Sequence, residues 1–249
     1  MRATGTTILI SGGTSGIGLA LAQRWHDAGN TVVVAGRRTG LLAQIAADHP
    51  GIATLELDVT DPASIAAAAR TAAERFPELD VLVTMAGIMR AEDLRDPASL
   101  ADAEATITTN LLGTIRTASA FLPQLLGREQ ATVLTVSSGL AFVPLPLTPT
   151  YNATKAGVHA WTESLRVQLA GTPVQVVELV PPSVQTELLG RQPDPHGMPL
   201  DEFADEAVGI LARDPDVREV LVDRVRFLRF AEAEGRYDEV LRALSAVPA

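Results

Sequence analysis

Short apolar runs alternate with longer stretches of helical periodicity along most of the chain. Seven of these runs are rich in β-branched residues, at residues 7–11, 31–36, 52–57, 80–85, 131–137, 174–180 and 219–223. Runs that are apolar at successive positions suit strands buried on both faces, as in a parallel sheet covered by helices. The pattern therefore predicts a three-layer α/β fold, a doubly wound parallel sheet of about seven strands with helices on both faces.

One stretch breaks this regularity. Residues from about 181 to 205 are rich in proline and glycine and follow the carboxyl end of a predicted strand, where ligands bind in open α/β sheets. We interpret the stretch as a loop that covers a site, with a plain connector as the alternative. The sequence has no linker or internal repeat, which predicts a single domain over residues 1–249. The residues after 223 are expected to form a helix that closes the core or a subunit contact.

Composition and charge limit the classes of partner. The 249 residues include 20 basic and 30 acidic ones, for a formal net charge of −10. An acidic protein repels nucleic acid and anionic membranes at long range, so neither is expected as a partner. The chain has no cysteine, and its histidines are too widely spaced for a helical ligand pair, so no metal is expected. The apolar run near residue 8 is too short for a secretory signal or a membrane span, which favours the cytoplasm.

A glycine-rich turn is the first candidate for chemistry. The stretch SGGTSGIG, residues 11–18, lies between a predicted strand and a predicted helix, the context of a dinucleotide-binding motif. Gly12 permits a tight turn, Gly16 lets the backbone approach a pyrophosphate, and Gly18 lets the helix pack closely on the sheet. An ordinary glycine-rich turn is the alternative. The cofactor contacts predicted here are Gly12, Thr14, Ser15, Gly16, Ile17 and Gly18.

The end of the second predicted strand indicates which dinucleotide binds. An NAD site usually has an acidic residue there, which binds the ribose hydroxyls. In this chain Gly36 occupies that position, and Arg37 and Arg38 follow it. Guanidinium groups suit a 2′-phosphate, and positive charge at a helix start is unfavourable unless an anion is close. NADP(H) is therefore predicted in preference to NAD(H).

Tyr151 and Lys155 are the second candidate for chemistry. They are four residues apart, so on a helix their side chains share one face. A free tyrosine has a pKa of about 10, and a neighbouring ammonium lowers it. The spacing alone is common, but Ser137 or Ser138 at the end of the fifth run, and Asn110 in a polar cluster of a predicted helix, provide context. An ordinary strand end and a polar helix face are the alternatives.

Five motifs together resemble the short-chain dehydrogenase/reductase family. They are SGGTSGIG, DVT at 58–60, NLLG at 110–113, VSS at 136–138 and YNATK at 151–155, in the family's order. The resemblance implies a Rossmann fold and an oxidoreductase that transfers a hydride between a nicotinamide and a carbonyl or secondary alcohol. Ser138 matches better than Ser137 because of its distance from the tyrosine. Matched position by position, the family's active-site residues are Asn110, Ser138, Tyr151 and Lys155.

The resemblance also implies a role for each of these residues. Tyr151 would be the general acid in reduction and the general base in oxidation, while Ser138 polarises the substrate carbonyl. Lys155 would bind the nicotinamide ribose and lower the pKa of the tyrosine, and Asn110 would join a water-linked proton relay. A homodimer or homotetramer built on the helices of Asn110 and Tyr151 is expected. Besides Asn110, Tyr151 and Lys155, the further cofactor contacts implied are Asp58, Val59, Ala86, Gly87, Pro181, Val184 and Thr186.

The chain departs from the family's pattern at two places. Thr84 and Met85 stand where asparagines are common, and Pro182 stands where a glycine is common, which removes a backbone donor beside the nicotinamide. The positions that match the family's substrate pocket are apolar, which predicts a small apolar ketone, aldehyde or alcohol as substrate. These positions are Leu140, Phe142, Val143 and Leu188.

A function of a different class stays open. A sensor or scaffold protein can keep the NADP-binding turn and catalyse nothing, but such a protein is free to lose the tetrad, whose four members are all present. An epimerase or dehydratase on the same fold usually has another glycine spacing and a longer carboxyl-terminal substrate domain. The sequence therefore favours an NADP(H)-dependent oxidoreductase.

Overall fold

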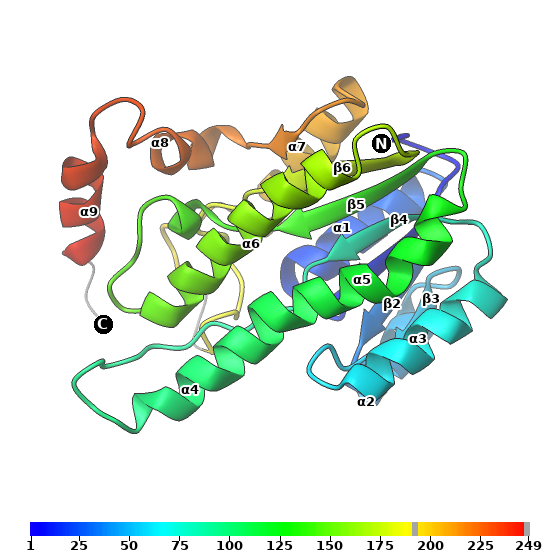
Figure 1. Ribbon diagram of the computed structural model, residues 1–249, viewed down its shortest axis with the longest axis horizontal. Helices are drawn as coiled ribbons and strands as arrows, with labels where there is room; N and C mark the ends of the chain where they lie inside the picture. Colours follow the sequence, from blue (N-terminus) through cyan, green and yellow to red (C-terminus); the bar gives the residue numbers. More distant parts are fainter. Residues whose placement is uncertain (191–193, 247–249) are drawn as a thin grey trace.

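The computed structural model describes residues 1–190 and 194–246. Within them, one sheet of seven parallel strands has the order β3-β2-β1-β4-β5-β6-β7 (Figure 1). Each strand falls on a predicted apolar run, so the predicted doubly wound sheet is confirmed. The strands are β1 (Thr7–Ser11), β2 (Thr31–Gly36), β3 (Ala53–Glu56), β4 (Leu79–Thr84), β5 (Ala131–Val136), β6 (Val174–Leu179) and β7 (Glu219–Val220).

Helices cover both faces of the sheet. On one face the core is closed by α1 (Gly16–Asp27), α2 (Thr39–Asp48) and α7 (Leu200–Arg213). On the other face it is closed by α3 (Pro62–Arg75), α5 (Gly113–Leu126) and α6 (Pro149–Gln168). Helix α4 (Ser99–Thr106) continues into α5 through a π-helical segment, η1 (Ile107–Leu112), so that the three form one long rod (Figure 1).

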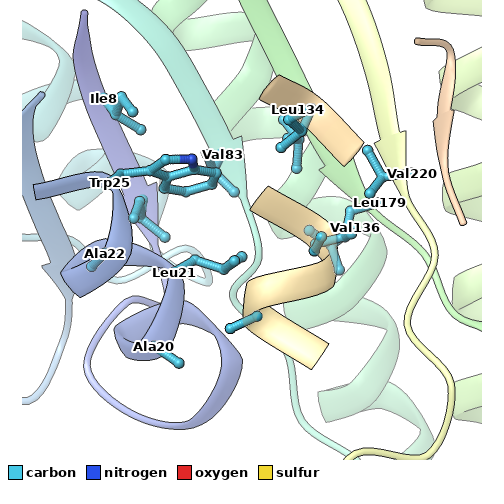
Figure 2. Close-up of a cluster of buried hydrophobic side chains, with 14 of the residues drawn as sticks. Ile8, Ala20, Leu21, Ala22, Trp25, Val83, Leu134, Val136, Leu179 and Val220 are labelled. Carbon is cyan, nitrogen blue, oxygen red and sulfur yellow. The ribbon is translucent and has the colours of Figure 1, made fainter. Parts of the chain in front are cut away.

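Figure 2 shows the core between the sheet and α1. Leu21 and Trp25 of α1 pack with Ile8 and Val83 of the central strands, and each of the four is at most 1% exposed. Burial of one such side chain contributes roughly 1.5–3 kcal/mol. Because side chains alternate along a strand, the residues between these point to the opposite face, toward α5 and α6.

The segment after residue 180 differs in part from the expectation. The loop is described over residues 181–190 and 194–199, and residues 191–193 of the predicted cover lie outside the described part of the chain. Helix α7 begins at Leu200, so the loop ends earlier than predicted. A bridge between Val184 and Met198 draws its two ends together.

The continuous helix predicted after residue 223 is wrong. The described part has η3 (Asp223–Val225), α8 (Arg226–Arg229) and α9 (Tyr237–Ser245), and residues 247–249 lie outside it. Gly235, with φ of +69°, precedes α9 in a backbone conformation that favours glycine and interrupts a helix. None of the described helices is long and apolar enough to cross a membrane.

Candidate active site

The glycine-rich turn lies close to the loop after β4. Gly12 has φ of +79°, and a Cβ atom there would lie 2.6 Å from Cα of Ala86. A Cβ atom on Gly18 would lie 2.5 Å from the carbonyl oxygen of Gly12, because α1 begins directly against the turn. Gly16 has φ of +53°, and a Cβ atom there would be 3.5 Å from Cγ2 of Thr186. The turn therefore needs glycine at all three positions, and it brings Thr186 to the start of α1.

Arg38 lies across this turn. Its Nη2 donates to Oγ1 of Thr14 at 2.6 Å and to Oγ of Ser15 at 2.9 Å. The first turn of α1 has no acidic residue, so its free backbone N–H groups and the guanidinium of Arg38 attract the same kind of ligand, an anion. A Cβ atom on Gly36 would lie 2.8 Å from Cγ2 of Thr14, so an acidic side chain at this strand end would require Thr14 to move.

Asp58 and Val59 follow β3. Oδ1 of Asp58 accepts hydrogen bonds from the backbone and hydroxyl of Thr60, at 2.9 and 2.7 Å. Burial opposes ionisation, but these bonds and the charge of Arg37 hold the pKa of Asp58 below its usual value. The side chain of Val59 is buried, and a Cβ atom on Gly113 would lie 2.9 Å from its Cγ2. Val59 therefore has only its backbone to offer a cofactor.

Tyr151 and Lys155 lie in the first two turns of α6, which has Thr148 as N-cap and Pro149 in its first turn. Tyr151 is 6% exposed and Lys155 is 5% exposed. Nζ of Lys155 donates to the carbonyl oxygen of Val136 at 2.8 Å and lies 5.6 Å from the centroid of the Tyr151 ring. The two side chains share one face of the helix, with the ammonium beside the tyrosine ring.

The pKa values of this pair differ from the expectation. Burial raises the pKa of Tyr151 to about 12, although the Ser138 hydroxyl opposes the rise. Burial also lowers the pKa of Lys155 to about 8. The prediction that Lys155 lowers the pKa of the tyrosine is therefore not met in the protein alone, because desolvation of the charged form is the largest influence on the pKa of each group.

The two candidate serines differ in surroundings. Ser138 precedes the short η2 (Gly139–Ala141), and its Oγ accepts from the backbone of Leu140 at 3.1 Å. Its influence on the pKa of Tyr151 places its hydroxyl close to the phenol. Oγ of Ser137 is buried and has no partner among the described residues. The geometry thus agrees with the choice of Ser138.

Asn110 lies in η1 and is fully buried. Its Oδ1 accepts from the backbone N–H of Ile88, its Nδ2 donates to the carbonyl oxygen of Ile88, and both distances are 2.8 Å. Nδ2 also donates to Oγ1 of Thr154 on α6, at 3.3 Å. The amide therefore joins the loop after β4 to α6 and hydrogen-bonds to neither Tyr151 nor Lys155 among the described contacts.

The other residues predicted to contact the cofactor lie around this edge of the sheet. A Cβ atom on Gly87 would lie 3.3 Å from Oδ1 of Asn110. The carbonyl oxygen of Pro181 accepts from the backbone of Gly139 at 2.9 Å. The side chain of Val184 belongs to the hydrophobic core, so only its backbone can contact a ligand. Ile17 also packs against that core.

Two of the four predicted substrate residues pack against the carboxyl-terminal segment, and for Phe142 the role in substrate contact stays a prediction. Val143 is fully buried among Leu228, Ala231 and Val240 of the carboxyl-terminal segment, so its side chain offers no surface to a substrate and the prediction for it is wrong. Phe142 is held with Arg229 4.5 Å above its ring.

The remaining two keep surface that a substrate can use. Leu140 is partly buried, in the short helix that begins after Ser138, and Leu188 is 43% exposed. They therefore remain the candidates for substrate contact.

Sequence reasoning missed a charged cluster beneath α6. His159, Glu178 and Glu219 place one donor atom each within 4.8 Å of one another. The available signal was Glu178 itself, the one charged residue in the buried strand β6. A second signal was Lys155, because it is the single lysine among 20 basic residues.

Known proteins resemble this chain along most of its length. The family model for short chain dehydrogenases matches residues 6–196. The uncharacterized oxidoreductase DltE of Bacillus subtilis is 38% identical over 200 residues, covering 80% of this chain and 79% of that protein. Sulfoacetaldehyde reductase 2 of Chromohalobacter salexigens is 33% identical over 184 residues, covering 72% and 73%.

Solved structures agree with these sequence matches. An alcohol dehydrogenase from Thermococcus sibiricus, complexed with 5-hydroxy-NADP, has a TM-score of 0.79 at 26% identity and covers 87% of this chain and 95% of that one. A short chain dehydrogenase from Burkholderia cenocepacia has the same fold, with a TM-score of 0.82 at 24% identity over the whole of both chains. Because the family match runs from before the glycine-rich turn to beyond Lys155, the chain belongs to the short-chain dehydrogenase/reductase family of oxidoreductases.

Proposed function

We propose that the protein is an NADP(H)-dependent oxidoreductase that interconverts a carbonyl and a secondary alcohol on a small, apolar substrate, with Tyr151 as general acid and base. The observation that carries this proposal is the buried Tyr151, with Ser138 near its hydroxyl and the ammonium of Lys155 against its ring. A phenol whose pKa is about 12 holds its proton at neutral pH, which is the state a general acid needs.

The residues around the glycine-rich turn fit the phosphate groups of a dinucleotide. The open backbone at Gly16, the uncapped start of α1 and the guanidinium of Arg38 provide a cradle for anions. The steric closure of Gly36 by Thr14 disfavours the acidic residue of an NAD site, which supports the preference for NADP(H). When bound, this cofactor supplies or accepts the hydride.

The chain's own residues move the proton. In reduction, Tyr151 donates its phenolic proton to the carbonyl oxygen as the carbon receives the hydride, and the tyrosinate regains a proton from solvent. Ser138 donates a hydrogen bond to the same oxygen and stabilises the charge that develops there. Lys155 stabilises the tyrosinate through its positive charge. Asn110 holds the loop of Ile88 against α6 and so keeps this group in place.

The apolar character of the substrate rests on Leu140, two residues after Ser138, and on the exposed Leu188 in the loop after β6. The similar sulfoacetaldehyde reductase is named for an anionic aldehyde, and such a substrate needs a nearby cation. Arg90, the candidate nearest in sequence to the loop after β4, is paired with Asp102. We also propose a homodimer or homotetramer, in which the rod of α4, η1 and α5 takes part.

The test is NADPH oxidation across a panel of apolar ketones, aldehydes and quinones, with Tyr151→Phe measured in parallel. We expect kcat to fall by at least about 100-fold in this variant, because the proton donor is lost while NADPH binding persists. Tyr237→Phe is the matched control, since the chain contains two tyrosines and Tyr237 lies in α9. Full turnover in Tyr151→Phe would refute the role of this residue. NADPH binding without turnover of any carbonyl would favour a sensor or scaffold.

A further inference from the structure

A carboxylate is buried in the strand next to the catalytic helix. Glu178 of β6 has no exposed surface, and it pairs in register with Thr135 of β5. Thr135 hydrogen-bonds through its hydroxyl to Thr162 of α6 at 2.8 Å, so this register position faces α6. The neighbours two and four residues earlier, Val176 and Val174, belong to the core on the same face. Glu178 thus interrupts an apolar surface, and a buried charge requires a partner.

The partner that touches Glu178 is His159. Nδ1 of His159 donates to the two carboxylate oxygens, at 2.9 and 3.1 Å. The hydrogen bond with Glu178 raises the pKa of His159 from its ordinary value. In the adjacent strand β7, Glu219 pairs in register with Glu178 and receives a bidentate ion pair from Arg229 of α8, at 2.8 and 3.0 Å.

A divalent cation is the first occupant to consider for this cluster. The histidine and the two glutamates present donor atoms close enough together for one ion. However, both oxygens of Glu219 are bound by Arg229, and the guanidinium places a positive charge beside the position that the ion would take. The cluster therefore already contains the cation that balances Glu219.

Lys155 is the other buried charge in this region. It precedes His159 by one helical turn, so the two side chains share a face of α6. Its ammonium donates to the carbonyl oxygen of Val136, and the register partner of Val136 is Leu179, the residue next to Glu178. A buried ammonium bound to a neutral carbonyl leaves its charge uncompensated, and Glu178 is the buried anion whose charge acts on Lys155.

We propose that Glu178 is a positioning residue of the active site, a buried counterion that is clamped by His159 and keeps Lys155 positively charged beside Tyr151. The proposal rests on the function proposed above, because that function gives the positive charge of Lys155 its role beside Tyr151. It also accounts for a charged residue in a buried strand.

Charges on every neighbouring element bear on this assignment. Burial lowers the pKa of Lys155 to about 8, and the charge of Glu178 opposes that fall. His159 is influenced by Glu178 of β6, then by Arg229 of α8 and Glu219 of β7. On α6 itself, His159 also acts on Glu163, which is paired with Arg166 and Arg218 at the surface. Removal of the Glu178 charge must therefore lower the pKa of Lys155 further.

The single lysine allows a direct measurement. In protein labelled with [ε-13C]lysine, one NMR signal reports the titration of Lys155. We expect the midpoint to fall by about one pH unit in Glu178→Gln, while Glu178→Asp, which keeps the charge, restores most of the shift. Glu163→Gln is the matched control on the same helix, and its midpoint should equal that of the wild type. Glu178→Met, apolar and similar in length, replaces Glu178→Gln if the latter does not fold.

The outcomes separate this inference from the proposed function. An unchanged midpoint in folded Glu178→Gln or Glu178→Met would overturn the counterion assignment, whether or not the protein has enzymatic activity. A lowered midpoint supports it. The alkaline limb of kcat/KM, measured on the same variants, should move to lower pH together with the NMR midpoint. A limb that stays in place while the midpoint moves would contradict the role of Lys155 in catalysis and leave the counterion assignment standing.

Discussion

Individual side chains at the end of β2 bear on the proposed preference for NADP(H). A Cβ atom on Gly36 would lie 2.8 Å from Cγ2 of Thr14, so the carboxylate that NAD sites hold at this position would require Thr14 to move. Arg37 and Arg38 were equivalent in the sequence, but they have different neighbours in the structure. Arg38 reaches the glycine-rich turn, whereas Arg37 acts on Asp58. The sequence could not separate them, because their neighbours are more than 20 residues away along the chain.

We therefore expect Arg38→Ala to weaken NADPH binding at least about tenfold while changing NADH binding little, because only NADPH has a 2′-phosphate for the guanidinium to bind. Arg37→Ala should change affinity in the same direction by a smaller factor, since Asp58 already balances part of its charge. Fluorescence titrations with both nucleotides measure the two ratios. Equal weakening of NADPH and NADH by Arg38→Ala would remove the phosphate argument.

At the scale of elements, the rod of α4, η1 and α5 contacts α6 on its inner side and leaves apolar side chains exposed on its outer side. Its inner side holds Asn110 against Ile88 and α6, and a Cβ atom on Gly157 of α6 would lie 3.2 Å from Leu111. The polar cluster around Asn110 lies in a π-helical segment, a form that is frequent at functional sites. The outer side leaves Ile107 41% exposed and Leu112 38% exposed. Exposed apolar residues at neighbouring positions favour association.

If the rod forms the subunit contact, the double substitution Ile107→Glu with Leu112→Glu should convert the assembly to a monomer. The wild type should sediment at two or four times the chain mass of 26.3 kDa, and the variant at that mass, because buried carboxylates are strongly unfavourable at an apolar interface. Leu94→Glu, at a residue 75% exposed in the loop after β4, is the matched control. A wild type that sediments as a monomer contradicts the proposed assembly.

At the scale of the whole molecule, the buried Lys155 makes the stability of the fold depend on pH. The folded protein lowers the pKa of this lysine from 10.5 to about 8, so between these values the unfolded chain binds the proton more tightly. The free energy of unfolding therefore rises with pH across this window, and this gain is lost again as the pH falls to 8. The contribution of Tyr151 to stability changes with pH in the opposite direction. Its pKa rises from 10 to about 12, so its contribution is complete below pH 10 and disappears as the pH approaches 12.

Lys155→Met should therefore stabilise the protein at pH 7 by at most about 3 kcal/mol while it abolishes turnover. The gain should shrink as the pH rises from 8 toward 10, because the wild-type lysine then loses its charge in the folded state. Urea unfolding at pH 7 and pH 10 measures the difference. Arg70→Met, at an exposed base on α3, should leave stability unchanged at both values. A gain that is equal at both pH values would contradict burial of a charged Lys155.

The sequence by itself determined what depends on neighbours along the chain. The strands, the glycine-rich turn and the shared face of Tyr151 and Lys155 all follow from periods of two to four residues. Only the tertiary structure decided the partner of Asn110, the burial of Val143 and the proximity of Glu178 to His159, because these contacts join residues 19 to 97 positions apart. The pKa values of Tyr151 and Lys155 belong to the same class, since the packing of distant elements sets how much water each charge loses.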